Sequence, residues 1–179
     1  CIRDSGGAVY SPAITDFILM VENTSYMFVT GPNVVKTVTH EEVSSEELGG
    51  ASTHATKSGV THFACANEIE AINQLKKILS YVPQNCEDNA PALAYEAANE
   101  ERLSLNDILP ANANQPYDIR EVIAGVTDEE SFLEVHAAYA ENIVVGFARL
   151  AGRSIGVIAN QPAYLAGVLD NNASVKAAR

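Results

Sequence analysis

Two nearly continuous apolar runs, separated by only two residues, constrain the fold of this 179-residue chain more than any other feature. The runs are IVVGFARL, residues 143–150, and RSIGVIANQ, residues 153–161, and Ala151 and Gly152 lie between them. A connection this short predicts a tight β-hairpin, because glycine adopts the positive φ that such turns require. Apolar residues occupy successive positions in both runs, so we expect both faces of the hairpin to be covered.

Shorter patterns predict a mixed α/β chain. The apolar segments DFILMV, residues 16–21, and YMFVT, residues 26–30, predict two buried strands separated by a polar turn. Short helices are expected over residues 33–39 and within SSEEL, where Ser and Glu have capping-box spacing and Gly49 and Gly50 follow.

The clearest helix is predicted over residues 68–80. Asn67 can cap its first turn, and Lys76 and Lys77 lie near its negative end. Apolar residues recur at helical spacing and predict a stripe that faces the core; they are Ile69, Ile72, Leu75, Ile78 and Leu79.

The segment that follows changes in character. Residues 83–116 are rich in Pro, Asn and acidic residues without periodicity, which predicts a linker. Residues 117–126 then predict a short helix, and residues 131–139 a strand that leads into a loop.

Composition excludes several classes of protein. A formal net charge of −12 disfavours nucleic-acid binding, which needs clustered Lys and Arg. No apolar run approaches the ~20 residues that span a bilayer and no basic leader begins the chain, so we expect no membrane insertion and a cytoplasmic location, or the mitochondrial matrix in a eukaryote. An anionic ligand remains compatible with local cations, which are Lys36, Lys57, Lys76, Lys77, Arg149 and Arg153.

Metal chemistry finds no support in the sequence. The three cysteines, Cys1, Cys65 and Cys86, form no C-x-x-C pair and are expected to be reduced thiols. The four histidines have no metal-ligand spacing, and no serine lies in a G-x-S-x-G elbow. We therefore expect no metal site.

Gly6 and Gly7 are the first candidates for a chemical role. They precede a helix expected to start near Ser11 and Pro12, where backbone N–H groups and the helix dipole can stabilise an oxyanion. The alternative is a tight turn with no chemical role.

Long segments of the chain resemble one family of proteins. They are TSYMFVTGPNVVKTVTHEEVSSEELGGASTHATKSGVTHFACANEIEAINQLKKILSYVP, YDIREVI and NIVVGFARLAGRSIGVIANQPAYLAGVLDNNASVKAAR. Together they resemble the carboxyltransferase β subunit of biotin-dependent acyl-CoA carboxylases, of the propionyl-CoA carboxylase type. The resemblance extends from Gly6 to Arg179 and fails at CIRDS, where the family has a small-residue turn. The missing four-cysteine zinc element also favours the propionyl type over some bacterial acetyl-CoA enzymes.

The resemblance implies a crotonase-like ββα superhelix. Residues 1–83 would be the C-terminal part of an N-terminal carboxyltransferase domain, 84–116 an interdomain linker, and 117–179 the start of a C-terminal carboxyltransferase domain. Because the chain begins with Cys1 and ends in a helix after DNNAS, it resembles a truncated fragment. The second Gly-Gly-Ala element of the family would be missing, so the fragment alone is expected to be inactive.

The resemblance also implies a reaction and its partners. Carboxybiotin, carried on a separate domain or subunit, would release its carboxyl group, and the enolate of a short acyl-CoA would accept it. Backbone oxyanion holes would stabilise both charges. The implied partners are the acyl-CoA, the biotin carboxyl carrier, the biotin carboxylase subunit and further copies of the chain in a dimer-built hexamer.

Site residues follow from the matching motifs. Gly6 and Gly7 would form the oxyanion hole of the N-terminal domain, and Ala8 is an adjacent donor. The substrate-lining candidates are Gly49, Gly50, Ala51, His54, Ser58, Gly59, Asn160 and Gln161. For these residues, a helix stop, loop packing and satisfied strand-end groups remain equal alternatives.

Two other functions remain open. One is the α subunit of a biotin-dependent methylmalonyl-CoA or glutaconyl-CoA decarboxylase, which has chemically the same site and differs in its partner. The other is a non-catalytic fragment that retains only the fold and its oligomer contacts. Acyl-chain specificity is not encoded in these residues, and only the overall resemblance favours propionyl-CoA.

Overall fold

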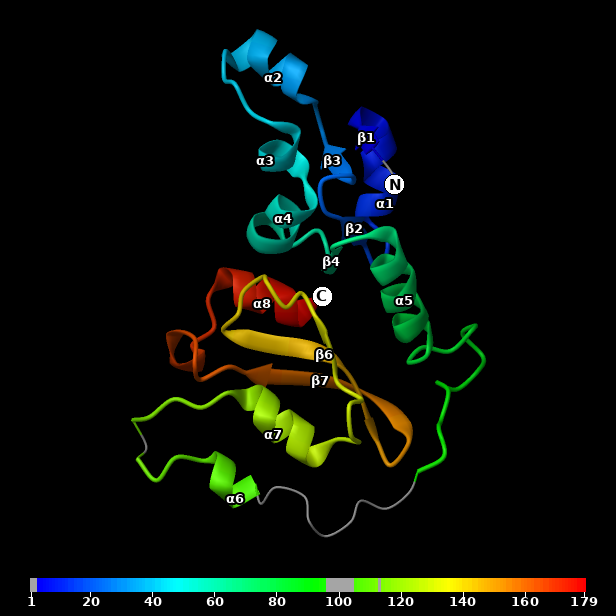
Figure 1. The fold of residues 1–179 in the computed structure, drawn as a ribbon, viewed down its shortest axis with the longest axis vertical. Helices are drawn as coiled ribbons and strands as arrows, with labels where there is room; N and C mark the ends of the chain where they lie inside the picture. The colour runs from blue at the N-terminus through cyan, green and yellow to red at the C-terminus, as the bar shows by residue number, and fades with distance from the viewer. Residues whose placement is uncertain (1–2, 96–104, 113) are drawn as a thin grey trace. The chain divides into compact units, whose positions relative to one another are not determined.

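The computed structural model describes residues 3–95, 105–112 and 114–179, which form two compact units (Figure 1). The first unit is Cys1–Leu75 and the second is Lys76–Arg179. Each unit combines short helices with its own β-strands, as the α/β prediction requires.

Two parallel strand pairs organise the first unit. Strand β1 (Arg3–Ser5) pairs with β3 (Tyr26–Phe28), and β2 (Leu19–Val21) pairs with β4 (Phe63–Cys65). The two strands predicted within residues 16–30 are therefore confirmed, although each is only three residues long. Parallel pairing requires crossover connections, and helical segments between the strands provide them.

The helices of the first unit are short. The capping box of Ser44 and Glu47 is present, and Gly50 is the C-cap that ends this helix, as predicted. The helix expected to start near Ser11 begins at Tyr10, and a 3₁₀ turn that starts at Gly6 precedes it. The segments are η1 (Gly6–Val9), α1 (Tyr10–Ala13), α2 (Pro32–Thr39), α3 (Ser45–Gly49), α4 (Ala51–Thr53) and the π-helical turn η2 (His54–Ser58).

One apolar cluster joins these pieces. Its buried members are Val9 of η1, Ile18 and Met20 at β2, Met27 of β3 and Ala51 of α4. Both glycine pairs named above therefore adjoin the same core: Val9 follows Gly7 by two residues, and Ala51 follows Gly50 directly.

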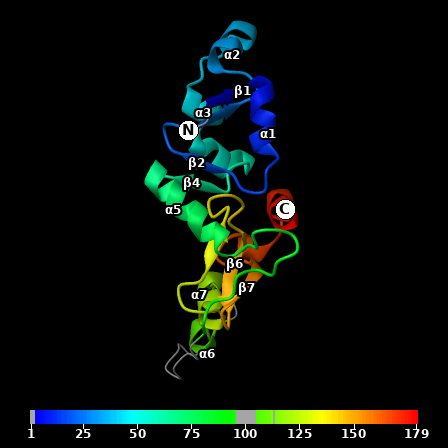
Figure 2. The same cartoon turned by 90° about the vertical axis from the view of Figure 1, so that its right-hand side faces the viewer.

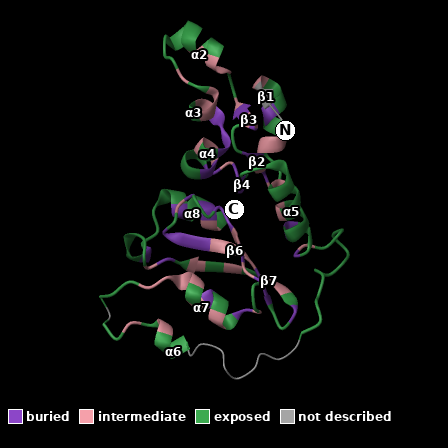
Figure 3. Cartoon of the chain, in the orientation of Figure 1, coloured by how far each residue is buried: buried purple, intermediate pink, exposed green. Residues whose placement is uncertain are grey.

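Helix α5 (Glu68–Leu79) confirms the predicted helix but not its burial. The Asn67 side chain caps it by accepting the Glu70 N–H at 2.9 Å. Of the predicted stripe only Ile78 is buried, and Ile69 is 73% exposed, so the expectation that this stripe faces the core is wrong for the described residues (Figure 3). A helical period shows that an apolar face exists and does not show what covers it.

The second unit is built on an antiparallel sheet in the order β5-β6-β7. Strand β5 (Leu133–Val135) is shorter than predicted, and β6 (Ile143–Leu150) and β7 (Arg153–Asn160) form the predicted hairpin, side by side in both views (Figures 1 and 2). Ala151 and Gly152 have φ values of 50° and 76°, as a two-residue turn requires.

The two hairpin strands differ in burial. Strand β6 lies between β5 and β7 and is largely buried. Strand β7 is an edge strand with alternating exposed residues, and Ile158 is 67% exposed, so the prediction that both faces of both strands are covered is wrong for β7. Helices α7 (Ile119–Val126) and α8 (Asn171–Ala178) contact β6, and the remaining turns are α6 (Leu105–Ile108) and η3 (Leu165–Gly167).

The described part of the linker is fixed to the hairpin turn. Leu93 N–H donates to the Gly152 carbonyl at 2.9 Å, and Arg149 donates to the Pro91 carbonyl at 2.9 Å. Arg149 is only 5% exposed, and its guanidinium also lies 4.7 Å from the ring centre of Tyr81. Part of the segment expected to be a linker therefore packs against the hairpin turn of the second unit.

Candidate functional site

The carboxyl ends of β1 and β3 define the candidate site in the first unit. Because the two strands are parallel, their carboxyl ends meet at one edge, where η1 begins at Gly6 and α2 begins at Pro32. Helix N-termini at such an edge present backbone N–H groups and a positive dipole end to a ligand. Gly6 and Gly7 thus lie at the start of η1 at this edge, and their assignment to an oxyanion hole stays a prediction.

Gly6 and Gly7 have different roles in this arrangement. The Gly6 N–H donates to the Val29 carbonyl at 3.0 Å, and its φ of 65° lies in the left-handed region. A Cβ added at Gly7 would meet no atom within 4 Å, and Gly7 and Ala8 are exposed. The Gly6 amide therefore fixes η1 to the end of β3, which leaves Gly7 as the glycine that a ligand oxygen can approach.

Gly49 is required by close packing against backbone, whereas Gly50 lies against the end of a flexible side chain. A Cβ at Gly49 would collide with the Met27 carbonyl, and one at Gly50 would collide with the Glu46 carboxylate. Both glycines are buried, and Ala51 is fully buried in the core. Packing accounts for these three residues, and their assignment to substrate binding stays a prediction.

His54, Ser58 and Gly59 close a turn with their own polar groups. One ring nitrogen of His54, Nδ1, lies 2.7 Å from Ser58 Oγ, and the other, Nε2, lies 2.8 Å from the Met27 carbonyl oxygen. Gly59 is buried, with a φ of 65°, and ends the π-helical turn. Both His54 nitrogens thus have protein partners, which favours the packing alternative for this residue.

Asn160 and Gln161 lie at the end of β7, in the second unit. Gln161 has 0% exposure, donates to Asp118 Oδ1 at 2.7 Å and accepts the N–H groups of Ile119 and Ala163 at 3.2 and 3.3 Å. Asn160 is exposed and donates to the Gly167 carbonyl at 2.7 Å. Satisfaction of backbone and cap groups therefore accounts for the fully buried Gln161, and the assignment of both residues to substrate binding stays a prediction.

Asp118 and its partners form a charged cluster that the sequence did not reveal. Arg120 makes a bidentate pair with Glu134, at 2.6 and 2.8 Å, and lies 3.4 Å from Asp118. Burial raises the pKa of Asp118, but hydrogen bonds from Gln161 and the Arg120 N–H, with the Arg120 charge, outweigh it and lower the pKa. The helix-cap position of Asp118 was the available signal, since Gln161 lies 43 positions from Asp118 and Glu134 lies 14 positions from Arg120.

Two cations of the second unit are enclosed by carbonyl groups. Lys176 is 3% exposed and donates to the carbonyls of Tyr139 and Ala140 at 2.7 and 3.3 Å. Burial lowers the pKa of Lys176 to about 8, against the opposing charges of Glu134 and Glu141. Arg149 is similarly enclosed by carbonyl groups. It is therefore not available to bind an anionic ligand, although the sequence had been compatible with that role.

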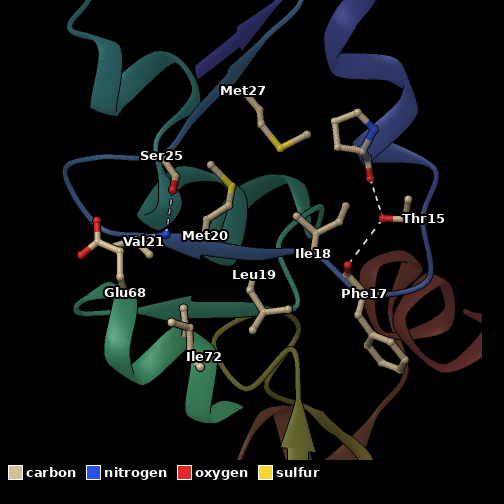
Figure 4. Close-up of a pocket in the computed structure, with 12 residues that line it drawn as sticks. Thr15, Phe17, Ile18, Leu19, Met20, Val21, Ser25, Met27, Glu68 and Ile72 are labelled. Carbon is tan, nitrogen blue, oxygen red and sulfur yellow. Dashed lines mark hydrogen bonds between the residues drawn. The ribbon is translucent and has the colours of Figure 1, made fainter. Parts of the chain in front are cut away.

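A cavity of about 540 Å³ lies beside β2 in the first unit (Figure 4). Its polar groups are already engaged: Thr15 donates to the Pro12 carbonyl at 2.8 Å, and Ser25 Oγ accepts the Val21 N–H at 3.0 Å. None of the predicted site residues lines it. The lining is Pro12, Thr15, Phe17, Ile18, Leu19, Met20, Val21, Ser25, Met27, Glu68, Ala71 and Ile72.

Neither a metal cluster nor a membrane-spanning helix is found within the described residues. No group of three or more His, Cys, Asp or Glu side chains there has the geometry to hold a metal ion. Over the same residues no helix is long and apolar enough to cross a bilayer. Cys65 is buried, and burial raises the pKa of its thiol, whereas Cys86 is an exposed free thiol.

Residues 2–179 match the model of the carboxyl transferase domain. The chain is 52% identical over 185 residues to the biotin-dependent acetyl-/propionyl-coenzyme A carboxylase beta5 subunit of Mycobacterium tuberculosis (strain ATCC 25618 / H37Rv), covering 98% of this chain and 33% of that protein. It is also 52% identical over 176 residues to the methylmalonyl-CoA decarboxylase subunit alpha of Veillonella parvula, covering 98% of this chain and 35% of that protein.

The fold is also similar to that of a solved structure. The crystal structure of transcarboxylase 12S, described as a hexamer with hydrolysed methylmalonyl-coenzyme A bound, aligns with a TM-score of 0.89 and 46% identity over 97% of this chain and 34% of that one. This likeness confirms the crotonase-like α/β fold. The chain spans about a third of the length of these relatives. It belongs to the carboxyl transferase domain family.

Proposed function

We propose that the full-length protein containing this chain is the carboxyltransferase component of a biotin-dependent acyl-CoA carboxylase. Its substrate would be a short acyl-CoA, with propionyl-CoA favoured. The observation that carries the proposal is the exposed Gly7 at the start of η1, in a chain 52% identical to an acetyl-/propionyl-coenzyme A carboxylase subunit.

The chain's own contribution is a backbone donor. The Gly7 N–H would donate to the thioester oxygen and strengthen this bond as the oxygen becomes an enolate, which lowers the barrier to loss of the α-proton. Ala8 is the adjacent candidate donor, and the open space around Gly7 fits a ligand oxygen that any Cβ would keep away. When bound, biotin on its carrier supplies the carboxyl group and a nitrogen that accepts the α-proton.

A Gly7→Val substitution in the full-length protein tests this role. The Cβ of the new side chain meets no atom within 4 Å, so the fold should persist, while kcat for propionyl-CoA carboxylation should fall by ~10²–10³. Gly156→Val is the control, because Gly156 also has open space around it and lies in β7. Near-normal turnover by Gly7→Val in the reconstituted holoenzyme would contradict the proposal.

The decarboxylase direction is the second candidate, and one observation supports it. The Veillonella decarboxylase subunit is as similar to this chain as the Mycobacterium carboxylase subunit is, at 52% identity. The two functions need the same enolate stabilisation and differ in partner. Copurification of an ATP-using biotin carboxylase supports the first function, and copurification of a sodium-pumping membrane subunit supports the second.

The proposed partners are a biotin carboxyl carrier, a biotin carboxylase subunit and further copies of the chain in a dimer-built hexamer. Exposed apolar side chains support self-association, because soluble monomers rarely leave such faces open. Examples are Ile14, Val38, Ile69, Ile158 and Leu165. A strictly monomeric species in light scattering at micromolar concentration would contradict the oligomer.

The free thiol of Cys86 suits a reducing compartment, the cytoplasm or a mitochondrial matrix.

Residues 1–179 alone should not catalyse transfer. Two oxyanions form in the reaction, and this segment carries a candidate donor for only one of them. Propionyl-CoA carboxylation by the 179-residue chain at the rate of the full-length protein would show that the chemistry is placed wrongly.

A further inference from the structure

Strand β3 is too short to fix its own position. It comprises only Tyr26–Phe28 and pairs with the equally short β1. Three-residue pairs have little intrinsic stability, so contacts outside the ladder must fix where the strand ends. The end of β3 matters because the Val29 carbonyl, one residue beyond it, holds the Gly6 N–H directly before Gly7.

His54 provides one of these outside contacts. Its Nε2 lies 2.8 Å from the Met27 carbonyl oxygen, two residues before Val29. A carbonyl only accepts, so Nε2 must carry a proton and donate. In the neutral ring Nδ1 is then an acceptor, and Ser58 Oγ, 2.7 Å away, is the hydroxyl that donates to it. The ring is thus fixed at both ends.

The turn that carries His54 is itself anchored. The Val60 N–H donates to Ser58 Oγ at 3.3 Å, the Thr61 N–H donates to the His54 carbonyl at 3.3 Å, and Gly59 ends the turn with positive φ. The turn is π-helical, a rare conformation that is frequent at functional sites. The buried Met27 and Ala51 side chains belong to the same apolar cluster, so packing keeps this region folded even without the His54 bond.

We propose that His54 is a positioning residue for the Gly7 donor, acting through Met27, Val29 and Gly6, and that it does not bind substrate. This inference rests on the proposed function of Gly7. Loss of the His54 bond leaves the apolar cluster in place and lets the end of β3 move. The Gly7 N–H is then displaced from its position while the first unit stays folded. Displacements of about 1 Å at a catalytic group lower rates by roughly 10²-fold.

Three variants of the full-length protein separate the alternatives. His54→Leu removes the donor, and His54→Gln restores an N–H at the reach of Nε2. Ser58→Ala removes the partner of Nδ1 and the acceptor of the Val60 N–H, and leaves the bond from Nε2 to Met27 in place. We expect His54→Leu to lower kcat for propionyl-CoA carboxylation by roughly tenfold or more with KM unchanged. His54→Gln should recover most of this loss, and Ser58→Ala should resemble the wild type more than His54→Leu does.

Other outcomes overturn the inference. A higher KM with unchanged kcat in His54→Leu would mean that His54 lines the substrate site. Equal losses in His54→Gln and His54→Leu would mean that the donor to Met27 is not what matters. Wild-type kcat in His54→Leu would mean that His54 does not position the Gly7 donor.

A second measurement keeps the inference separate from the proposed function. Hydrogen exchange of the Gly6 amide in the full-length protein, followed by mass spectrometry of peptides that contain Gly6, reports the Gly6–Val29 bond without any catalysis. His54→Leu should accelerate this exchange by about fivefold, as expected for a weakened neutral hydrogen bond, and His54→Gln should not. If the wild-type holoenzyme transfers no carboxyl group, the proposed function fails, whereas unchanged Gly6 exchange in His54→Leu refutes the positioning role.

Discussion

The Gln161 side chain should stabilise the second unit by several kcal/mol, although it was first considered as a ligand contact. We consider Gln161→Met, which keeps the length of the side chain and removes its amide. The substitution removes a bond to the ionised Asp118 and leaves the Ile119 and Ala163 N–H groups without their acceptor. A hydrogen bond to a charged group contributes about 1.5–3 kcal/mol and a neutral one about 0.5–1.5 kcal/mol.

The two neutral bonds, at 3.2 and 3.3 Å, belong at the low end of that range. Allowing for the apolar gain of methionine, we expect a loss of about 3 kcal/mol, a large share of the ~5–15 kcal/mol that stabilises a typical domain. Asn160→Ala is the matched control, because Asn160 is next to Gln161 in the sequence, is exposed and makes one side-chain hydrogen bond, to the Gly167 carbonyl. This variant should lose less than about 1 kcal/mol of stability.

The assay is urea unfolding of the 179-residue chain, followed by NMR signals of amides in β6. At an m-value of about 2 kcal/mol/M, the midpoint for Gln161→Met should fall by about 1.5 M. The pKa of Asp118 should also rise, since Gln161 supplies the first of the hydrogen bonds that lower it. A Gln161→Met variant within about 1 kcal/mol of the wild type, or no less stable than Asn160→Ala, would refute this reasoning.

Two further predictions concern the fold. Gly49→Ala should destabilise the first unit by about 2–4 kcal/mol in urea unfolding, because its Cβ would collide with the Met27 carbonyl, whereas Gly156→Ala should change stability by less than about 1 kcal/mol. The free energy of unfolding of the wild type, relative to that of Lys176→Met, should increase as pH rises from about 8 to the ordinary lysine pKa of 10.5. In this range the native state has lost the Lys176 proton and the unfolded state still binds it. Unfolding curves measured across this range should differ by up to about 1.4 kcal/mol per pH unit, and a constant difference would show that Lys176 does not titrate early.

Local sequence patterns predicted the helices and strands of this chain better than they predicted which residues are buried. The Asn67 cap and helical spacing located α5, and the Ala151–Gly152 turn located the hairpin. The same patterns overstated burial in α5 and β7, because periodicity describes one element and burial depends on what packs against it.

The candidate site was only partly predictable for the same reason. The Gly-Gly pattern correctly indicated a following helix, but it showed neither the strand before Gly6 nor the bond from Gly6 to Val29. Gln161 meets Asp118 across 43 positions of sequence, and His54 meets Met27 across 27, so no local rule joins these partners. Tertiary hydrogen bonds decided which polar residues are free to meet a ligand.

The hairpin turn also has a consequence for the order of folding. The Asp128 carboxylate accepts the N–H groups of Ala151 and Gly152, at 2.9 and 2.7 Å, and the Leu93 backbone then adds to the outer side of the same turn. A two-residue turn closes within microseconds, whereas the segment around Leu93 must be brought in from almost sixty residues away. The turn should therefore act as a template on which that segment docks late. Substitutions at Asp128 should slow folding, and substitutions at Arg149, which holds the docked segment, should mainly speed unfolding.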